Sequence, residues 1–374
     1  MKNFKAGTYI SQGSYKSFQP SSLNREWTID NMEVWKLLSQ ADRELGRLDM
    51  YSNYIPNIDL FISMHVLKEA TQSNKIEGTQ TKMEEALLDR EDIPLDKRDD
   101  WEEVQNYSKA MDWAVKGLEK LPFSNRLIRQ THKILIQGVR GDKKQPGEFR
   151  KSQNWIGGAS INDAVFVPPV HTSVIDLMSD IEKFIHNESI LLPELLKIGL
   201  VHYQFETIHP FLDGNGRVGR LMIPLYLDSK NILKKPILYL SDFFERNRKL
   251  YYENLTLVRE DNNIEQWFKF FLVGIIETCR HGISTFDGIM QLQKEVDVKL
   301  QHLGTRIAPA KAVINYLYQK PLVNADTVCK ISGISMPSAY KLISGMEKIG
   351  ILHELTGGQR GRLYAFEEYL NLFR

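Results

Sequence analysis

A segment near the middle of this 374-residue chain combines residue types that handle phosphate groups; it reads HPFLDGNGRVGR and runs from His209 to Arg220. The imidazole of His209 can accept a proton near neutral pH. The carboxylate of Asp213 is a hard oxygen ligand, suited to a Mg²⁺ ion that bridges phosphates. Arg217 and Arg220 are three positions apart, so a helix would place them on one face, where they can bind two phosphates. These residue types predict phosphoryl-type chemistry.

The glycines of this segment predict how an anion would be bound. Gly214 and Gly216 carry no β-carbon, so backbone N–H groups near them can approach an anion closely. A helix that begins near Arg217 would add its unpaired N–H groups and the positive end of its dipole. The alternative is a basic, solvent-exposed helix start that follows a core histidine. The combination of base, carboxylate, glycines and guanidiniums in one loop favours the phosphate site.

The segment also matches the dinucleotide-binding pattern GxGxxG at Gly214, Gly216 and Gly219, and Asp242 follows at about the expected distance. That pattern requires a buried strand immediately before its first glycine. Residues 195–208 are too long for a typical strand and carry apolar residues at helical spacing. The context therefore disfavours a Rossmann-type site.

Apolar residues recur at spacings of three and four through most of the chain, which predicts a mainly α fold. Between about 153 and 170, turn signals and a short β-type run predict a small β-hairpin. Residues 1–25 are rich in Ser, Gln and Gly and are interpreted as an irregular arm. Helical patterning is expected at 30–88, 101–118, 125–137, 174–187, 195–208, 217–229, 243–258 and 264–303.

Residues 304–309 are interpreted as a linker to a separate C-terminal unit. Helices expected at 310–319, 324–332 and 337–350, followed by a Gly-rich hairpin at 352–366, predict a winged helix-turn-helix domain. Residues 306–374 contain nine Lys or Arg and five Asp or Glu, so this unit is basic. DNA contact is one interpretation, and protein docking or dimerisation is the alternative. The residues nominated for DNA contact are Ser335, Ser338, Tyr340, Lys341, Gln359, Arg360 and Arg362.

The twelve residues from His209 to Arg220 resemble the signature of the Fic family, HxFx(D/E)GNGRxxR, at every specified position. The resemblance extends over about residues 30–300 and implies the mostly helical Fic fold. It implies transfer of AMP from ATP to a Ser, Thr or Tyr hydroxyl of a target protein, and to the chain itself, with release of pyrophosphate. Fic relatives that act as kinases lose the glycines of the GNG triplet, and both are present here.

The resemblance also implies roles for single residues. His209 would deprotonate the target hydroxyl and Asp213 would hold Mg²⁺. Asn215, with the loop amides, would bind the α-phosphate of ATP, while Arg217 would hold the triphosphate and Arg220 the γ-phosphate. The ATP-binding stretch implied by the family comprises Gly214, Asn215, Gly216, Arg217, Val218, Gly219, Arg220 and Leu221, together with Glu77 and Tyr252.

An earlier segment, from Ser73 through Glu77 to Gly78, resembles the inhibitory motif (S/T)xxxE(G/N) of the same family. Its position before the catalytic segment matches the class with an N-terminal inhibitory helix. The implied mechanism is that Glu77 pairs with Arg220 and prevents ATP from adopting a productive geometry. The alternative is an ordinary helix end with Gly78 as its cap. Removal of AMP by the same glutamate is left open.

Two further features gain a role from the resemblance. The hairpin at 162–169, with Ala164, Val165, Phe166 and Val167, resembles the flap that pairs with an extended target segment through backbone hydrogen bonds. A plain surface hairpin is the alternative. Tyr252 matches an adenine-contacting tyrosine by its spacing from the loop, and a buried core tyrosine is the alternative.

The expected organisation has three parts: an N-terminal helical region with the inhibitory motif (1–100), a Fic catalytic domain (101–303) and the winged-helix domain (306–374). Lys and Arg number 48 and Asp and Glu 47, so no overall charge indicates nucleic acid or membrane. Two cysteines, Cys279 and Cys329, cannot form a disulfide framework.

No signal-peptide pattern or apolar run of membrane-spanning length is present in the sequence, so a cytoplasmic protein without membrane contact is expected. The rival function is a DNA-binding regulator whose Fic-like part only senses nucleotide, although such a sensor has no need of His209. Transfer of another nucleotide or of phosphocholine stays open, as does a homodimer.

Overall fold

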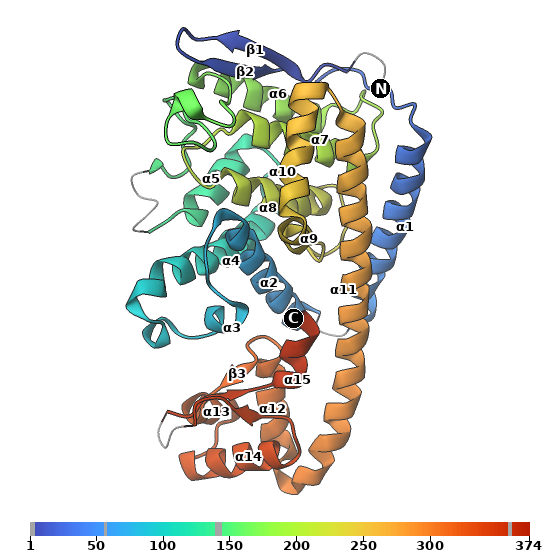
Figure 1. The fold of residues 1–374 in the computed structure, drawn as a ribbon. Helices are drawn as coiled ribbons and strands as arrows, with labels where there is room; N and C mark the ends of the chain where they lie inside the picture. The colour runs from blue at the N-terminus through green and yellow to red at the C-terminus, as the bar shows by residue number, and fades with distance from the viewer. Residues whose placement is uncertain (1–3, 56–57, 139–143, 358–360) are drawn as a thin grey trace.

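The computed structural model describes residues 4–55, 58–138, 144–357 and 361–374, and it is mainly helical (Figure 1). Helix α11 runs along the molecule beside α1 and continues to the C-terminal unit (Figure 1). The helices of the main body are α1 (Met32–Tyr54), α2 (Asp59–Glu77), α3 (Met83–Ala86), α4 (Arg98–Leu118), α5 (Asn125–Leu135), α6 (Val174–His186), α7 (Glu194–Ile208), α8 (Asn215–Ser229), α9 (Ser241–Arg246), α10 (Arg248–Asp261) and α11 (Ile264–Leu300).

Helices α7 and α8 form the centre of the core. All residues from Leu195 to Ile208 of α7 are buried, as are those from Asn215 to Leu227 of α8. A helix that is buried on all sides needs neighbours on all sides, and α2, α4, α5, α6 and α11 pack against this pair. The Trp267 indole of α11 is fully buried and donates to the carbonyl oxygen of Gly199 (2.8 Å). The loop between α7 and α8 is therefore held by two rigid, buried elements.

The prediction of an irregular arm at residues 1–25 is wrong. Strands β1 (Gly7–Ser11) and β2 (Lys16–Pro20) form an antiparallel hairpin in which Gly7 lies opposite Pro20. The buried Phe18 ring packs against Tyr9 and Phe166, which links this hairpin to the segment predicted as a flap. Its short strands are stabilised by this long-range packing, which no local pattern reveals.

Three element boundaries also differ from the sequence prediction. The helix expected at 243–258 is divided into α9 and α10 at Asn247. The linker expected at 304–309 is helical, comprising a 3₁₀ turn, η6 (Gln301–Arg306), and the start of α12 (Ile307–Leu317), with a sharp kink at Gly304. The hairpin expected at 153–170 contains a single bridge between Ile156 and Phe166 instead of a ladder of pairs.

The C-terminal unit follows the predicted order of elements. Its three short strands form an antiparallel sheet in the order β3-β5-β4. Gln359 and Arg360, nominated for DNA contact, lie outside the described residues. The remaining elements of the unit are α12, β3 (Leu322–Val323), α13 (Ala325–Ser332), α14 (Met336–Lys348), β4 (His353–Glu354), β5 (Tyr364–Ala365), α15 (Glu367–Leu370) and a 3₁₀ turn, η7 (Asn371–Phe373).

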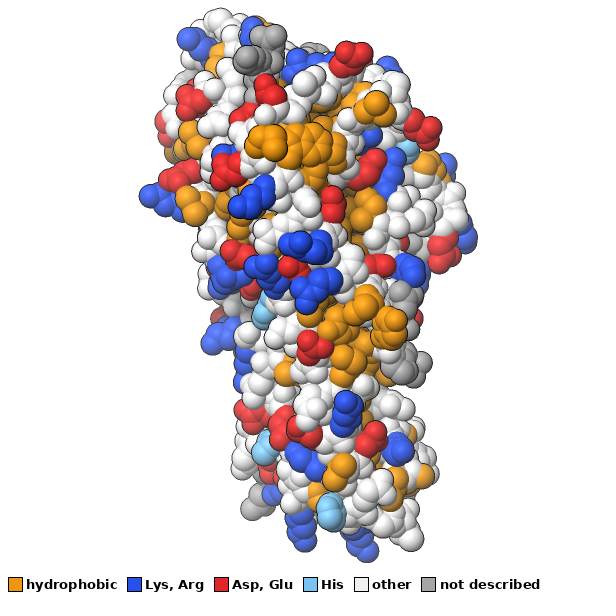
Figure 2. Space-filling view, turned by 90° about the vertical axis from the view of Figure 1, so that its right-hand side faces the viewer, with side chains coloured by type: hydrophobic (Ala, Val, Ile, Leu, Met, Phe, Trp, Pro, Cys, Tyr) orange, Lys and Arg blue, Asp and Glu red, His pale blue; other side chains and the backbone are white. Residues whose placement is uncertain are grey.

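Figure 2 shows a face on which acidic and basic side chains are interspersed and apolar side chains form separate patches. The mixture of acidic and basic side chains on this face agrees with the net charge of +1 for the whole chain. Within the described residues, no helix has the length and apolar character needed to cross a membrane.

Candidate active site at the start of helix α8

The loop between α7 and α8 is closed on itself by Asn215. The side-chain oxygen of Asn215 accepts from the backbone N–H of Phe211 (2.8 Å), and its amide nitrogen donates to the carbonyl oxygen of Phe211 (2.9 Å). Gly214 precedes α8 in a left-handed conformation, and His209 ends α7 in the same region of backbone space. Asn215 is 2% exposed and is used within the loop, so its side chain shapes the anion site instead of facing a ligand.

His132 of α5 supports the same loop. Its ring stacks on Phe211 with centroids 3.7 Å apart, and its Nδ1 accepts from the backbone N–H of Gly147 (2.9 Å). Nε2 therefore carries the proton and donates to the carbonyl oxygen of Asp213 (3.0 Å). Burial lowers the pKa of His132 to about 4, which keeps this tautomer neutral. His132 therefore has a structural role in this loop.

Arg220 is held by the segment Ser73–Gly78 at the end of α2, which the sequence predicts to be inhibitory. Its Nε donates to the hydroxyl of Ser73 (2.9 Å), and its Nη2 donates to the Ser73 carbonyl (2.9 Å) and to a carboxylate oxygen of Glu77 (2.6 Å). The Arg220 side chain is 1% exposed, against 35% for Glu77. The pairing that the Fic resemblance implies is therefore present in the geometry.

The Glu77 carboxylate lies on the backbone of Gly216. A β-carbon at Gly216 would overlap a Glu77 oxygen, so the carboxylate can lie there only because residue 216 is glycine. The N–H groups at the start of a helix attract anions, and this carboxylate is the anion that lies at the start of α8. Burial alone would raise the pKa of Glu77, but the guanidiniums of Arg220 and Arg217 outweigh it and hold the pKa below its usual value.

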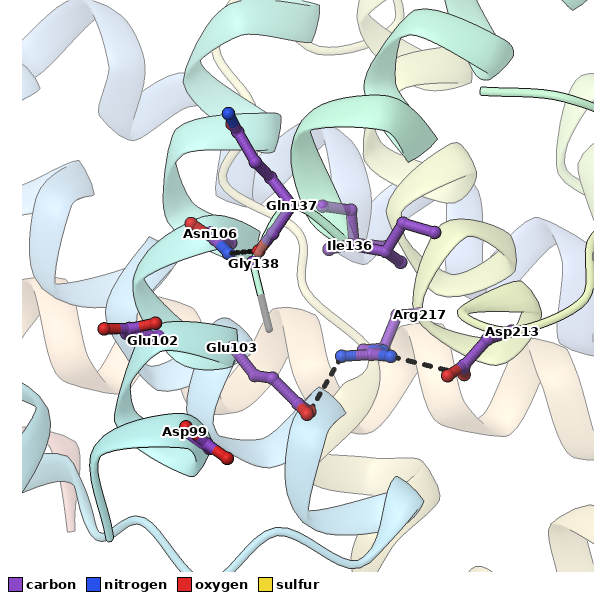
Figure 3. Close-up of a pocket in the computed structure, with 10 residues that line it drawn as sticks. Asp99, Glu102, Glu103, Asn106, Ile136, Gln137, Gly138, Asp213 and Arg217 are labelled. Carbon is purple, nitrogen blue, oxygen red and sulfur yellow. Dashed lines mark hydrogen bonds and ion pairs between the residues drawn. The ribbon is translucent and has the colours of Figure 1, made fainter. Parts of the chain in front are cut away.

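Arg217 is oriented by three groups at the other side of the loop, and Figure 3 shows two of them, Glu103 and Asp213. Nη1 donates to Glu103 of α4 (2.9 Å) and to the side-chain oxygen of Asn74 of α2 (3.2 Å), and Nη2 lies 3.5 Å from the Asp213 carboxylate. A cavity of about 30 Å³ borders this cluster. Helix α2 thus contacts both arginines of the signature.

His209 is unprotonated at neutral pH. Burial lowers its pKa to about 4, although the carboxylate of Glu77 acts in the opposite direction. A neutral imidazole next to an anion site can take a proton from a hydroxyl group, as a general base requires.

Asp213 is the residue that could hold a metal ion. Its carboxylate is 44% exposed, and one oxygen accepts from the backbone N–H of Gly214 (2.6 Å). Among the described residues no group of three or more His, Cys, Asp or Glu could hold a metal by itself. A single exposed carboxylate fits Mg²⁺, which keeps several waters and binds mainly through substrate phosphates.

Of the adjacent tyrosines, Tyr252 is the accessible one. Tyr252 is 42% exposed, whereas Tyr251 is 1% exposed and donates to Nε2 of His202 (2.8 Å). His202 in turn donates from Nδ1 to the carbonyl oxygen of Gly219 (2.9 Å), so Tyr251 and His202 support α8 from behind. Only Tyr252 is therefore open to a ligand. Val218 and Leu221 of the implied ATP-binding stretch are buried in the core.

The segment predicted as a flap has one exposed side chain and two buried ones at its centre. Val165 is 81% exposed, whereas Phe166 and Val167 are buried. Phe166 exchanges backbone hydrogen bonds with Ile156 (2.8 and 3.1 Å), and the Val167 carbonyl accepts from Phe18 of β2 (2.9 Å). The flap is thus supported from behind by β2, while Val165 faces outward.

Glu206 lies one turn before His209 and was not among the predicted site residues. It is 8% exposed, and its Oε1 accepts no hydrogen bond from any described residue. A β-carbon at Gly219 would overlap this oxygen, so the carboxyl group lies directly against α8. Burial raises the pKa of Glu206 to about 7, opposed by Arg220 and assisted by Glu77. No spacing pattern distinguishes Glu206 from a surface glutamate.

Glu206→Gln is expected to stabilise the protein above pH 7 and to change it much less at pH 5. The folded protein holds the Glu206 proton up to about pH 7, whereas the unfolded chain releases it near 4.5, so wild-type stability falls between these pH values. At pH 8 the gain in unfolding free energy should be about 3–3.5 kcal/mol, because the folded and unfolded pKa values differ by about 2.5 units at 1.4 kcal/mol per unit. Thermal unfolding of both proteins at pH 5 and 8 measures it. Equal differences in Tm at both pH values would contradict the assignment.

Two sequence models of known protein families match this chain. The sequence model described as "Fic/DOC family N-terminal" matches residues 35–116, and that described as "Fic/DOC family" matches residues 122–227. "Protein adenylyltransferase Fic" from Drosophila yakuba is 32% identical over 127 residues, and that from Drosophila melanogaster is 31% identical over the same length. Each alignment covers 33% of this chain and 24% of the relative, so the chain spans about a quarter of these curated relatives.

Solved structures share the fold at low identity. A Fic family protein from Desulfovibrio desulfuricans G20 superposes with a TM-score of 0.60 at 18% identity, over 91% of this chain and 98% of that one. Fic-1 from C. elegans gives a TM-score of 0.51 at 18% identity, over 70% of this chain and 75% of that one. Because both family models match and together span half of the chain, and because the fold is shared with solved Fic proteins, this chain belongs to the Fic/DOC family.

Proposed function

We propose that this chain transfers AMP from ATP to a Ser, Thr or Tyr hydroxyl of a target protein, and to itself. The observation that carries the proposal is a neutral, half-buried His209 beside a helix start at which Arg220 meets the Glu77 carboxylate and Arg217 lies three positions away on the same helix. The relatives named "Protein adenylyltransferase Fic" support this chemistry.

The reaction follows from the same groups. The target hydroxyl oxygen attacks the α-phosphorus of ATP as its proton passes to the imidazole of His209. The bond from the α-phosphorus to the bridging oxygen breaks, and pyrophosphate leaves with the bonding electron pair. Arg217 and Arg220 stabilise the negative charge on the leaving phosphates, and the backbone N–H groups at the start of α8 stabilise the α-phosphate. Mg²⁺ held at Asp213 would supply further positive charge there. Tyr252 would contact adenine, and the flap at Ala164–Val167 would align the target chain.

We further propose that the state described here is autoinhibited, with the segment Ser73–Gly78 as the inhibitor. Glu77 engages Arg220 and covers Gly216, so the γ-phosphate loses its cation and the triphosphate cannot lie in line for attack. This arrangement matches a family class with an N-terminal inhibitory helix. The same glutamate could orient a water and remove AMP, which is a separate activity to assay.

The position of the transferred label tests the proposal. The full chain and its Glu77→Gly variant are incubated with Mg²⁺, a cell lysate and ATP labelled at either the α- or the γ-phosphate. Protein label from α-labelled ATP only is expected. Label from γ-labelled ATP only would indicate a kinase, and no label from either would favour the nucleotide-sensing regulator or a donor other than ATP.

A DNA-binding role for residues 306–374 is the second candidate. On α14, Tyr340 is 53% exposed and Ser335 lies within hydrogen-bond distance of Ser338 (3.0 Å), so polar groups of the third helix of the predicted winged helix face solvent. A mobility-shift assay of the full chain at several salt concentrations tests it, because phosphate contacts weaken steeply with salt. Absence of a shift at low salt would leave protein docking or dimerisation as the role of this unit.

A further inference from the structure

Arg150 is a buried cation whose donors all meet backbone carbonyls. It is 2% exposed, although its position in a polar stretch predicts a solvated surface charge. Its Nε donates to the carbonyl of His209 (2.9 Å) and its Nη2 to that of Ile208 (3.3 Å). Nη1 donates to the carbonyl of Ser152 (3.1 Å) and Nη2 also to that of Pro169 (2.5 Å). One guanidinium thus connects three segments of the chain, at Ser152, at Pro169 and at Ile208–His209.

A permanent charge suits this position. The carbonyls of Ile208 and His209 lie at the end of α7, where unpaired carbonyls and the negative end of the helix dipole favour a cation. Burial lowers the pKa of Arg150 to about 10, so the group stays charged at neutral pH. A lysine could keep the charge but not the planar fork that reaches separate carbonyls.

Ser152 and Pro169 lie at the two ends of the hairpin segment, residues 153–170, that carries the flap. We propose that Arg150 is a positioning residue that fixes both ends of this hairpin segment to the backbone of His209, so that the flap presents a target hydroxyl opposite the base. Asn154 extends the contact, since its side-chain nitrogen donates to the carbonyls of His209 (3.4 Å) and Phe211 (3.1 Å). This inference rests on the proposed AMP transfer and concerns the acceptor side of that reaction.

The nucleotide side does not depend on Arg150. Arg217 is held by Glu103 and Asn74, and Arg220 by the inhibitory segment, while Asn215 closes the loop through Phe211. Loss of Arg150 should therefore impair the transfer of AMP to a protein acceptor more than it impairs the binding of ATP.

The test uses Arg150→Lys in the full-length Glu77→Gly chain, with Lys151→Ala as a control at a neighbouring exposed position. With α-labelled ATP and a cell lysate, protein-bound AMP is compared with free AMP released by hydrolysis. The ratio of protein-bound to free AMP should fall at least about tenfold, whereas the Kd for a non-hydrolysable ATP analogue should change less than about threefold. A proportional fall of both products, or an unchanged ratio, would overturn the proposal.

A readout without turnover separates this inference from the proposed function. Hydrogen exchange at the backbone amides of Ile156 and Phe166 reports the flap directly, and it should accelerate in Arg150→Lys and not in Lys151→Ala. If Glu77→Gly releases and transfers no AMP, the proposed function fails, and exchange at these amides still decides whether Arg150 holds the flap. Unchanged exchange would contradict the role of Arg150 even in an active enzyme.

A different set of contacts joins the C-terminal unit to the inhibitory helix. The buried Phe61 ring of α2 lies 5.1 Å from the Tyr318 ring and 6.4 Å from that of Tyr369. One turn further, the His65 ring lies 5.0 Å from Phe373 in an edge-on arrangement. Just beyond α2, Arg374 pairs with Glu84 (2.9 Å), and Lys320 with Asp89 (2.7 Å).

Helix α2 therefore has one end on the C-terminal unit and the other on Arg220. A helix of 19 residues spans about 28 Å and behaves as a rod over this length, so a shift at Phe61 is transmitted to Glu77. We infer that packing of Tyr318, Tyr369 and Phe373 against α2 keeps Glu77 on Arg220, and that the C-terminal unit thereby controls the inhibited state. This inference rests on the proposed autoinhibition.

Phe373→Ala in the full chain tests the coupling, with Leu355→Ala at an exposed position of the same unit as the control. AMP transfer by Phe373→Ala should exceed that of wild type at least about fivefold, and it should not rise further in Glu77→Gly/Phe373→Ala, because both changes release Arg220. No rise in a folded single variant, or a multiplicative rise in the double variant, would overturn the inference.

Hydrogen exchange again provides an outcome that does not need activity. Amides in the last turn of α2, at Ser73–Glu77, should exchange faster in Phe373→Ala than in Leu355→Ala. If no variant transfers AMP, the proposed function fails while this measurement still decides the coupling; equal exchange in both variants would refute it.

Discussion

Glu77→Gly should raise AMP transfer at least about tenfold over wild type, since a hydrogen bond between charged groups contributes about 1.5–3 kcal/mol and 1.4 kcal/mol is a factor of ten. The change frees Arg220 for the γ-phosphate and uncovers the start of α8 at Gly216. Initial rates with α-labelled ATP measure the effect. Equal rates for the variant and wild type would remove autoinhibition by Glu77 from the proposal.

Two controls separate the causes of that gain. Glu77→Gln removes the charge but retains a hydrogen-bonding oxygen for Arg220, so it should activate less than Glu77→Gly. Glu91→Gly makes the same substitution at an exposed residue away from the site and should leave the rate unchanged. Equal activation by Glu91→Gly would point to general loosening instead of release of Arg220.

His209→Ala in the Glu77→Gly chain should lower AMP transfer about 10²–10⁴-fold, the range that a positioned general base contributes. Binding of a non-hydrolysable ATP analogue should persist, because Arg217, Arg220 and the start of α8 are unchanged. His171→Ala, at an exposed histidine, is the matched control and should remain active. Full activity of the His209→Ala variant would exclude His209 as the base.

The pH profile of the Glu77→Gly chain also tests the role of His209, because it reports the protonation state of this residue. A base with a pKa near 4 is deprotonated at every pH above about 5, so the protonation of His209 should not limit the rate between pH 6 and 8. Removal of the Glu77 carboxylate takes away an interaction that raises this pKa, so the variant should not acquire an inflection near pH 6.5. A rate that falls tenfold per pH unit below 6.5 would show that His209 is solvated in the working enzyme.

The part of the site that could be predicted from sequence is the part formed by neighbouring residues. His209, Asp213 and the two arginines lie in one loop and one helical turn, so their spacing alone places them together. Glu77 was predicted from a motif, and its contact with Arg220 joins residues that are 143 positions apart. Its partner could be named only because the family pattern supplied it.

The supporting residues could not be predicted in the same way. Arg150 follows an apolar residue in a polar stretch, and only the folded chain brings four carbonyls to its guanidinium. Glu206 is one of several acidic residues in the sequence. One oxygen of its carboxyl group has no hydrogen-bond partner among the described residues because α7 packs closely against α8. Strands β1 and β2 are short and depend on Phe18 meeting Phe166, a contact across well over a hundred residues.

The kink at Gly304 decides on which side of the molecule the last seventy residues lie. Its φ of 59° and ψ of −124° belong to a region that residues with a β-carbon avoid, so the path turns back there instead of prolonging the axis of α11. Because of that reversal, Tyr318 and Phe373 meet α2 and do not project into solvent at the far end of a long rod. A single backbone angle thus directs the C-terminal unit onto helix α2, and an alanine at this position would have to adopt a strained conformation for the two parts to stay in contact.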